Sequence, residues 1–518
     1  MKMRKMPIGI QTFENLITEG YAYVDKTEWV HSLANEGKYF FLGRPRRFGK
    51  SLLLSTLRAY FEGKKELFKG LAMERLEKDW TTHPVLHIDL NVASYGNVAD
   101  LEEGLDTNLC MFEEEWGLDG QSAGQSPSAR FHKLIRTAYE RSGRKVVVLV
   151  DEYDKPLLQT MERNEANDDI RAELKGFYGV LKSADRWLRF VLLTGVTKFS
   201  KVSVFSDLNM LRDISMEKAY AGVCGISAKE LAASFGPELV ALAENNGMTY
   251  DEAMAEMKKR YDGYRFCEDD REGMFNPFSV LNTLAKRKFD YYWFETGTPT
   301  FLIEQMKHEN FDPLRFAEGV TVSARSIDDY RMGGGNPVPL LYQSGYLTIT
   351  NYKNDRYTLD FPNEEVRYGF LEELLPYYTY RPPGGDFFAD YFLDDLRAGD
   401  ADGFMKRMRS FFANIPYDLN EDTERHYHLV FYLVFTLLGQ YARAEVHSAK
   451  GRADAIVETE DAVYVFEFKL NGTAEEALAQ IDEKGYAIPY EAGGRRVVKI
   501  GAAFDKGERN IGRWLVES

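Results

Sequence analysis

Cysteine is scarce in this sequence. The three cysteines, Cys110, Cys224 and Cys267, lie far apart and show neither the spacing of a metal site nor that of a redox pair. The pattern argues against cysteine-based metal or redox chemistry, and it fits a protein of a reducing compartment.

Long hydrophobic runs are also missing. The strongest run, residues 429–438, is too short to span a bilayer and predicts a buried helix instead. The basic N-terminus, residues 1–6, is not followed by an apolar core of signal-peptide length. We therefore expect a cytoplasmic protein that does not enter a membrane.

An excess of positive charge is absent as well. The formal net charge is −16, so the surface is not basic all over, and any contact with nucleic acid must come from a local patch. An apolar content of 44% with 28% charged residues is typical of a folded globular protein. A chain of 518 residues is too long for one core and predicts about three domains.

The clearest motif occupies residues 39–54. An apolar strand (39–42) leads into a turn with glycine and proline (43–49), and a helix opens at Lys50. The N–H groups of such a turn and the positive end of the following helix face an anion. Lys50 would reach the β- and γ-phosphates of ATP, and the Ser51 hydroxyl would bind Mg²⁺. The predicted ATP-binding residues in this segment are Gly43, Arg47, Phe48, Gly49, Lys50, Ser51 and Leu52.

This turn departs from the usual phosphate-binding spacing. Five residues separate Gly43 from Gly49, whereas the common motif has four, and Arg44 stands where the first glycine belongs. The alternative interpretation is a basic turn without a ligand. The strand–turn–helix context and a second motif downstream favour nucleotide binding.

The second motif is the apolar run 146–150 followed by Asp151 and Glu152. A strand buried on both faces that ends in two acids is the place for a Walker-B site. Asp151 would hold the Mg²⁺ shell, and Glu152 would orient and polarise the attacking water. The alternative is a strand that ends in a solvated acidic turn.

A further apolar strand, residues 190–195, ends in polar residues. In nucleotidases with a Walker-B glutamate, a strand inserted between the two Walker strands ends in a group that senses the γ-phosphate. Thr194 is the candidate here. Alternatively, its hydroxyl satisfies the backbone at the strand end.

The C-terminal region carries a separate set of acids. Strands are expected at 443–448, 452–458 and 462–469, followed by a helix at 474–485. Glu467 and Lys469 are two residues apart and project from one face of their strand. Asp454, on the preceding strand, is expected beside Glu467. Two converging carboxylates attract Mg²⁺ or Mn²⁺, and Lys469 would position water or stabilise the phosphate in the transition state.

Two short segments in the middle of the chain are capping boxes, at residues 227–230 and 249–252, and each predicts the start of a helix. Residues 276–279 (Asn-Pro-Phe-Ser) predict the start of another helix. Residues 293–302 predict a turn that leads into one more. Helix 338–343 and strands 346–352 and 356–361 follow in the order of a winged helix, which either joins domains or contacts DNA. With a linker at 381–385, the predicted domains are 1–225, 226–385 and 386–518. The middle domain is expected to be a helical lid with a winged-helix connector.

These motifs together resemble a known family. Arg44-Pro-Arg-Arg-Phe-Gly-Lys-Ser51, Val150-Asp-Glu-Tyr-Asp-Lys-Pro156 and Thr194-Gly-Val-Thr-Lys-Phe199 resemble bacterial AAA-ATPase-like proteins whose chains end in a domain of the PD-(D/E)XK nuclease superfamily. The resemblance implies an α/β fold with a P-loop parallel sheet of the ASCE type, and the five-residue spacing resembles that family's own pattern.

The C-terminal acids agree with that resemblance. Asp454, Glu467 and Lys469 have the order of the nuclease signature, and Gln480 matches a polar position that often supports such a site. Glu424 and Glu445 are further candidates for the carboxylate cluster. The alternative is a restriction-endonuclease-like α/β domain that has lost its activity and serves as a scaffold.

The sequence therefore predicts two activities. Mg·ATP would bind at Gly49, Lys50, Ser51 and Asp151 with Glu152 as base, and DNA would be cut by Asp454, Glu467 and Lys469, with ATP turnover gating the cut. One alternative is a non-cleaving ATPase switch whose C-terminal domain binds nucleic acid or a protein partner. Another is a nucleotide that serves as a structural ligand. Assembly into a homo-oligomer is left open.

Overall fold

The structure is a computed structural model that divides the chain into two compact units. The N-terminal unit comprises Met1–Thr296 and Thr321–Asn363, and the C-terminal unit comprises Gly297–Val320 and Glu364–Ser518. The residues it describes are 4–118, 124–161, 163–198, 208–269, 272–293, 302–303, 305–306, 311, 313–317, 319–327, 336–379, 389–413, 423–439, 443–446, 453–505, 507–508 and 510–518. The predicted linker at 381–385 and most of the turn and helix predicted at 293–302 lie outside them.

A five-stranded sheet forms the centre of the N-terminal unit. Its strands, in chain order, are β1 (Tyr39–Gly43), β2 (Val85–Asp89), β3 (Val146–Asp151), β4 (Leu188–Gly195) and β5 (Arg212–Asp213). Their spatial order is β2-β3-β4-β1-β5, and every pair is parallel. This confirms the predicted parallel sheet, including the strand that lies between the two motif-bearing strands.

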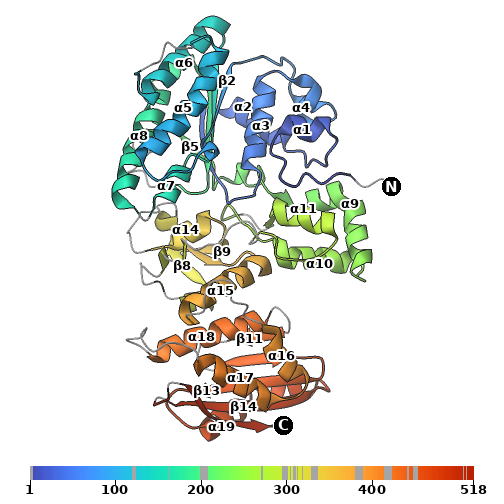
Figure 1. Ribbon diagram of the computed structural model, residues 1–518. Helices are drawn as coiled ribbons and strands as arrows, with labels where there is room; N and C mark the ends of the chain where they lie inside the picture. The colour runs from blue at the N-terminus through green and yellow to red at the C-terminus, as the bar shows by residue number, and fades with distance from the viewer. Residues whose placement is uncertain are drawn as a thin grey trace. The chain divides into compact units, whose positions relative to one another are not determined.

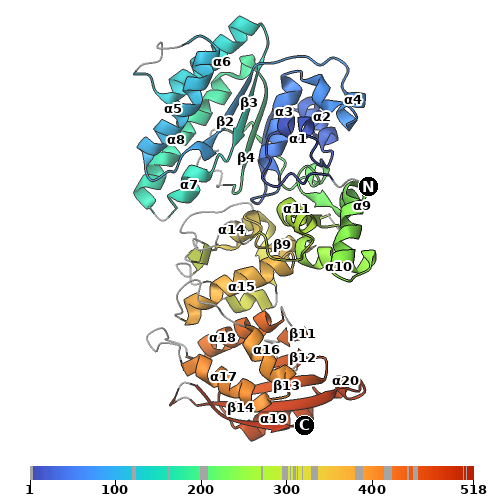
Figure 2. The same ribbon diagram turned by 45° about the vertical axis from the view of Figure 1, so that its right-hand side comes forward.

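Helices cover both faces of this sheet because its central strands are apolar on both sides. All six residues of β3 are buried, so water must be excluded from each face. One group of helices is α1 (Phe13–Thr18), α2 (Thr27–Glu36), α3 (Lys50–Phe61) and α4 (Ala72–Leu76). The other group is α5 (Val98–Glu115), α6 (Pro127–Ser142) and α8 (Asn164–Ser183). Figure 1 and Figure 2 show the two groups on opposite sides of the sheet.

Two parts of this unit differ from the expectation. The glycine, serine and glutamine residues of the stretch 117–129 predict a surface loop, and this prediction is wrong at its end, since α6 begins at Pro127. The Ser126 side chain accepts the Ala129 N–H at 3.3 Å, and Pro127 occupies the first turn, which is a common helix start. The sequence interpretation also assigned no structure between the two motifs at 154 and 190, where α7 (Lys155–Gln159) and α8 lie.

The middle of the chain contains the expected helices. They are α9 (Ala228–Asn245), α10 (Tyr250–Tyr261) and α11 (Pro277–Lys286), with the short hairpin β6 (Ile226–Ser227) and β7 (Met274–Phe275). Both predicted capping boxes are present at the starts of α9 and α10. Apolar side chains of the three helices form one core, which includes Leu239, Met257 and Val280.

The predicted helix and two strands further on are also confirmed. They are α14 (Val338–Gln343), β9 (Thr348–Lys353) and β10 (Arg356–Asp360), and β8 (Val320–Ser323) completes a three-stranded sheet of order β8-β10-β9. The β9–β10 turn is formed by Asn354 and Asp355, both with positive φ (53° and 55°). Two such residues in a row are the requirement of a tight hairpin turn.

A second five-stranded sheet forms the C-terminal unit. Its strands are β11 (Arg443–Val446), β12 (Ala455–Glu458), β13 (Ala462–Lys469), β14 (Arg496–Asp505) and β15 (Asn510–Glu517), in that spatial order. Its helices are α15 (Glu364–Thr379), α16 (Ala389–Arg397), α17 (Ala401–Ala413), α18 (Thr423–Leu438), α19 (Ala474–Lys484) and α20 (Ile488–Glu491). The three strands and the following helix that the sequence predicts are present as β11, β12, β13 and α19.

The two faces of β13 meet different helices. Phe466 and Phe468 contact the rings of Phe404 in α17 and of Phe431 and Phe435 in α18. The opposite face carries α19, which connects β13 to its parallel neighbour β14 (Figure 1). The side chains of Glu467 and Lys469 alternate with the phenylalanines, so they belong to the α19 face.

Gly501 allows α19 to lie close to this sheet, and its substitution is the first test of the fold. Gly501 pairs with Glu467 across β13 and β14. A Cβ at 501 would lie 2.5 Å from the backbone N of Leu478 and 2.6 Å from the carbonyl O of Ala474. Since backbone atoms cannot step aside, Gly501→Ala should destabilise the unit by about 1–3 kcal/mol.

Amide hydrogen exchange of β13 and β14 in the full-length protein measures this loss as reduced protection. Gly493→Ala is the matched control, because the Cβ there would have 3.4 Å to its nearest neighbour, the Tyr490 carbonyl. Equal protection in Gly501→Ala and in the parent would contradict the packing described.

Candidate functional site

The parallel register gathers the motif residues of the N-terminal unit at one edge of the sheet. Gly43 at the end of β1 pairs with Gly195 at the end of β4, and Asp151 at the end of β3 pairs with Asp89 of β2. Ligands of open α/β sheets bind outside this carboxyl edge. The turn 44–49 and Glu152 follow directly from these strand ends.

The turn before α3 folds around the Lys50 ammonium group. Its backbone is left-handed at Arg47 (φ 68°) and at Gly49 (φ 94°). Lys50 is only 4% exposed, and its Nζ donates to the carbonyls of Arg44 (3.1 Å) and Pro45 (3.2 Å). The same ammonium group lies 3.7 Å from Oε1 of Glu152. Lysine and glutamate from the two motifs therefore face one point at the N-terminus of α3, where the helix dipole favours an anion.

Asp151 is held by two hydrogen bonds. Its Oδ1 accepts the Thr194 hydroxyl at 2.7 Å and the Glu152 N–H at 3.0 Å. The Thr194 hydroxyl also lies 3.3 Å from the Val150 carbonyl, which is the backbone contact that the alternative interpretation of this residue expects. Glu152 has a φ of 51°, which is unusual for a residue with a side chain and is a form of strain common at functional sites.

Other predicted binding residues have different surroundings. The Phe48 ring packs against Tyr264 and Phe266, with centroids 4.7 and 5.5 Å away, so only its backbone is placed to meet a ligand. The Arg47 guanidinium lies 4.8 Å from the centroid of the Phe278 ring. Ser51 and Leu52 are half-buried in the first turn of α3. The Gly43 N–H donates to the Ser215 hydroxyl at 2.8 Å.

Arg44, which replaces the first glycine of the common motif, points into the protein. It is 1% exposed, and its guanidinium donates to the carbonyls of Gly43, Ser215 and Tyr220 at 2.6–3.0 Å. It also lies 4.0 Å from the Phe266 ring centroid. Burial lowers the pKa of the guanidinium. This arginine fixes the turn from behind instead of facing a phosphate.

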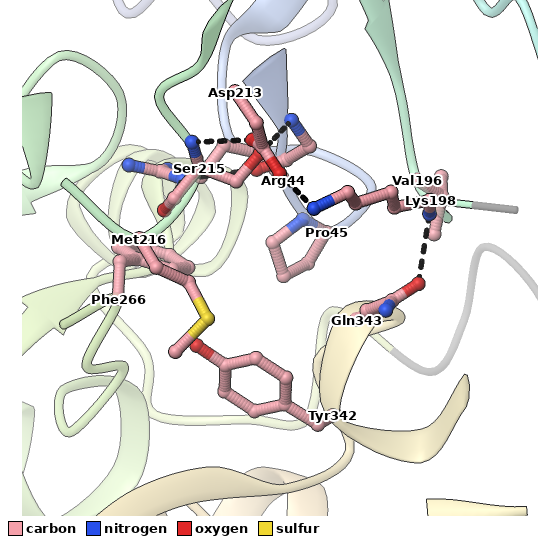
Figure 3. Close-up of a pocket in the computed structure, with 11 residues that line it drawn as sticks. Arg44, Pro45, Val196, Lys198, Asp213, Ser215, Met216, Phe266, Tyr342 and Gln343 are labelled. Carbon is pink, nitrogen blue, oxygen red and sulfur yellow. Dashed lines mark hydrogen bonds and ion pairs between the residues drawn. The ribbon is translucent and has the colours of Figure 1, made fainter. Parts of the chain in front are cut away.

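A pocket opens beside the first half of the turn (Figure 3). Its lining includes Pro45 from the turn, Lys198 from the segment after β4, and Gln343 from α14. The Lys198 N–H donates to Oε1 of Gln343 at 2.8 Å, and its ammonium group lies 2.5 Å from Oδ2 of Asp213. The segment after β4 is thus joined to α14 and to the end of β5.

Asp154 lies within the segment Val150-Asp-Glu-Tyr-Asp-Lys-Pro156, but no role was predicted for it from the sequence. Asp154 is fully buried near the same carboxyl edge. Burial, with a contribution from the charge of Glu152, raises its pKa to about 6. The only signal in the sequence is a third acid close behind Asp151 and Glu152.

In the C-terminal unit, the four predicted nuclease residues converge. The antiparallel pairing of Ala455 with Phe466 places Asp454 opposite Glu467 when it is continued by one residue. Oδ2 of Asp454 accepts the Phe468 N–H at 2.8 Å, and Nζ of Lys469 lies 3.4 Å from Oε1 of Glu467. Gln480 of α19 accepts from the Lys469 ammonium and donates to the same Glu467 oxygen.

Glu467 carries the clearest sign of a missing partner. The residue is 3% exposed, and no described residue donates a hydrogen bond to its buried Oε2. Burial and the charge of Asp454 raise its pKa to about 7, against the opposing effect of Lys469. A divalent cation would satisfy this oxygen, so the donor set fits Mg²⁺ or Mn²⁺.

No group of three or more histidine, cysteine or acidic side chains suited to a metal occurs among the described residues. A pair of carboxylates is nevertheless sufficient for Mg²⁺, because water and substrate phosphate supply its other ligands. The side chains of Glu424 and Glu445, the further candidates, lie outside the described part of the chain. In that part, no helix has the length and apolar character needed to cross a membrane.

The fold and the two sites define a P-loop ATPase-like unit joined to a nuclease-like α/β unit. Residues 7–205 match the family described as "Predicted AAA-ATPase", and residues 422–514 match the "PD-(D/E)XK nuclease superfamily". The chain belongs to the AAA-ATPase-like proteins that carry a C-terminal domain of this superfamily, as the sequence predicted. It is 38% identical over 533 residues, covering 100% of both chains, to an "Uncharacterized protein in vnfD 5'region" of Azotobacter chroococcum mcd 1.

The raised pKa of Glu467 predicts a specific pH dependence of stability without metal. Its folded-state pKa of about 7 exceeds the ordinary value of 4.5. At pH values between these two, the carboxyl group is protonated in the folded state and ionised in the unfolded state. Stability should therefore fall as the pH rises from about 5 to about 7.5. Glu467→Gln should remove this fall and, above that range, exceed the parent by on the order of 1–3 kcal/mol.

Hydrogen exchange of β12 and β13 in the full-length protein with chelator, corrected for the intrinsic rate at each pH, measures this difference. The matched control is Glu458→Gln, which removes a buried carboxylate of β12 that pairs with Arg495 at 2.5 Å and should give no gain at high pH. A Glu467→Gln profile parallel to that of the parent would show that this carboxyl is not protonated near neutrality.

Proposed function

We propose that this protein is a cytoplasmic enzyme that binds and hydrolyses ATP in one domain and cleaves DNA with Mg²⁺ or Mn²⁺ in another. The observation that carries the proposal is the convergence of Asp454, Glu467, Lys469 and Gln480 on one face of a sheet, with a buried Glu467 oxygen unsatisfied. Family membership and the nucleotide site support it. The proposed domains are 1–225 (ATPase), 226–385 (lid and connector) and 386–518 (nuclease).

At the nucleotide site, the residues have separable roles. Lys50 exchanges its contacts with the turn carbonyls for β- and γ-phosphate oxygens, while Ser51 and Asp151 hold the cation that accompanies ATP. Glu152 orients the attacking water and draws its proton, and Thr194 fixes the Asp151 carboxylate. Mg²⁺, when bound, would neutralise part of the negative charge on the phosphates.

At the nuclease site, Asp454 and Glu467 hold the cation, which supplies polarisation of the scissile phosphodiester. Lys469 orients the attacking water or stabilises the charge that grows on the phosphate oxygens. Gln480 contacts both Lys469 and Glu467, so it fixes the distance between the positive and the negative group. Gating of the cut by ATP turnover is proposed because the two sites share one chain.

The ATPase proposal is tested by two variants of the full-length protein. Glu152→Gln keeps the shape of the base and removes its charge, so it should bind ATP as the parent does and lose hydrolysis by about 100-fold or more. Lys50→Ala removes the phosphate contact and should lose binding itself. Phosphate release and the binding of a fluorescent ATP analogue measure the two effects.

As a control, Arg58→Gln removes a positive charge from the exposed side of α3, where Arg58 bonds Glu62 at 2.7 Å, and should leave the hydrolysis rate within about threefold of the parent. Hydrolysis by Glu152→Gln at the parental rate would refute the role of the base. Binding of ATP without turnover by the parent would favour the nucleotide as a structural ligand.

The nuclease proposal is tested with plasmid DNA and Mn²⁺, with and without ATP. We expect the parent to cut, and Glu467→Ala to lose about 1000-fold or more of the rate, because the cation loses a ligand. Gln480→Leu should retain the carboxylates and cut roughly 10- to 100-fold more slowly. Gating predicts that Lys50→Ala cuts without a response to ATP.

The outcomes separate the proposals. Intact plasmid under every condition, with ATP still consumed, would favour a non-cleaving switch. Cleavage by Lys50→Ala with the parental rate and ATP response would refute gating and leave the nuclease standing.

A further inference from the structure

We propose that Asp154 is a positioning residue of the nucleotide site. Its carboxylate bonds Val196 and Thr197, directly after β4, to the turn after β3. It thereby sets the places of Thr194, near the end of β4, and of Glu152. This inference rests on the proposed ATP hydrolysis, which the experiment below tests separately.

Three donors from the segment after β4 converge on the Asp154 carboxylate. Its Oδ2 accepts the backbone N–H of Val196 at 3.0 Å, the backbone N–H of Thr197 at 2.6 Å and the Thr197 hydroxyl at 2.7 Å. Asp154 and Thr197 are both fully buried. A buried carboxylate is costly unless it is well bonded, and three donors favour its ionised form.

The bonds of Asp154 are not those of an ordinary helix cap. Asp154 directly precedes α7 and occupies its N-cap position, where an aspartate commonly accepts the helix's own N–H groups. Here its side chain makes no such capping bond and points to the segment after β4 instead. Stabilising α7 therefore does not explain why an acid stands at this position.

Neighbouring contacts tighten the same junction. The Tyr153 N–H donates to the Thr194 carbonyl at 3.0 Å, and the Tyr153 hydroxyl donates to the Thr197 carbonyl at 2.7 Å. A Cβ at Gly195 would collide with Oδ1 of Asp154 and with the Tyr153 ring. The turn after β3 and the segment after β4 are thus in direct contact from residue 153 onward.

These contacts between the turn after β3 and the end of β4 lie on both sides of Glu152, the proposed catalytic base. On one side of Glu152, Asp151 is bonded to Thr194, and on the other side, Tyr153 and Asp154 are bonded to residues 194–197. The unusual φ of Glu152, 51°, is held between these two attachments. Releasing the Asp154 attachment should let Glu152 relax and move its carboxylate away from Lys50, and small displacements of this kind are costly to catalysis.

The test compares turnover and binding of ATP in full-length variants. Asp154→Asn has almost the same shape, but its amide replaces an accepting oxygen with a donor that faces other donors. We expect kcat for ATP hydrolysis to fall between about 10-fold and 100-fold, with the Kd of a fluorescent ATP analogue within about threefold of the parent. Thr197→Val removes one donor and should lower kcat in the same direction by a smaller factor.

Glu113→Gln controls for loss of a buried carboxylate elsewhere. Glu113 of α5 accepts from the Arg130 guanidinium at 2.8 and 3.0 Å, so this variant should lose stability and retain kcat within about twofold. Thermal unfolding is measured for every variant. If Asp154→Asn does not fold, Thr197→Val decides the question.

Parental kcat in the folded Asp154→Asn or Thr197→Val protein would overturn the inference. A loss of kcat in Glu113→Gln equal to that in Asp154→Asn would also overturn it, because general destabilisation would then explain both. If the parent hydrolyses ATP and Glu152→Gln does not, these outcomes leave the proposed ATPase intact. A parent without hydrolysis would overturn both proposals.

Discussion

The parallel pairing of β1, β4 and β3 is the constraint on which the nucleotide site depends. These strands end at the same edge, so the segments that follow them must meet there although they are distant in the chain. Because β4 lies between the other two, its last hydroxyl, from Thr194, reaches the Asp151 carboxylate. If β4 did not lie beside β3, the hydroxyl and the acid would belong to strands that do not touch. The order of the strands thus determines the chemistry of the site.

Much of this arrangement could be predicted from periodicity. The apolar run before Asp151 indicated a strand buried on both faces, and the alternation within residues 462–469 indicated that Glu467 and Lys469 share a face. These features depend on local sequence, and the structure has both. The roles of Arg44 and Asp154 depend on partners distant in the chain, Tyr220 and Thr197. No local pattern shows whether a basic or acidic side chain in a turn points outward or into the protein. The start of α6 was missed for a different reason. The glycine, serine and glutamine residues of the stretch 117–129 predicted a loop, although Pro127 is favourable in a first helical turn.

The buried acids of the two units differ in how they are satisfied. Asp151 and Asp154 accept hydrogen bonds from neighbouring segments, so the folded chain itself compensates for their loss of water. Glu467 shares one oxygen between Lys469 and Gln480, while the other oxygen has no donor among the described residues. An unsatisfied buried carboxylate is costly. The first pair therefore stabilises a fixed geometry, whereas the unsatisfied oxygen of Glu467 supports the cation site that we propose.

This difference bears on whether the C-terminal domain is only a scaffold. A scaffold gains nothing from a carboxylate inside its sheet, because an apolar side chain at the same place would fill the space without the cost of desolvation. Lys469 and Gln480 reduce that cost by bonding one oxygen, yet Oε2 has no hydrogen-bond partner among the described residues. Burial and the charge of Asp454 together raise the pKa of Glu467. Repulsion between two acids destabilises the fold alone and favours a divalent cation between them. A bound cation would offset both the repulsion between the two carboxylates and the unsatisfied Oε2. This is the arrangement expected of a metal site that is in use.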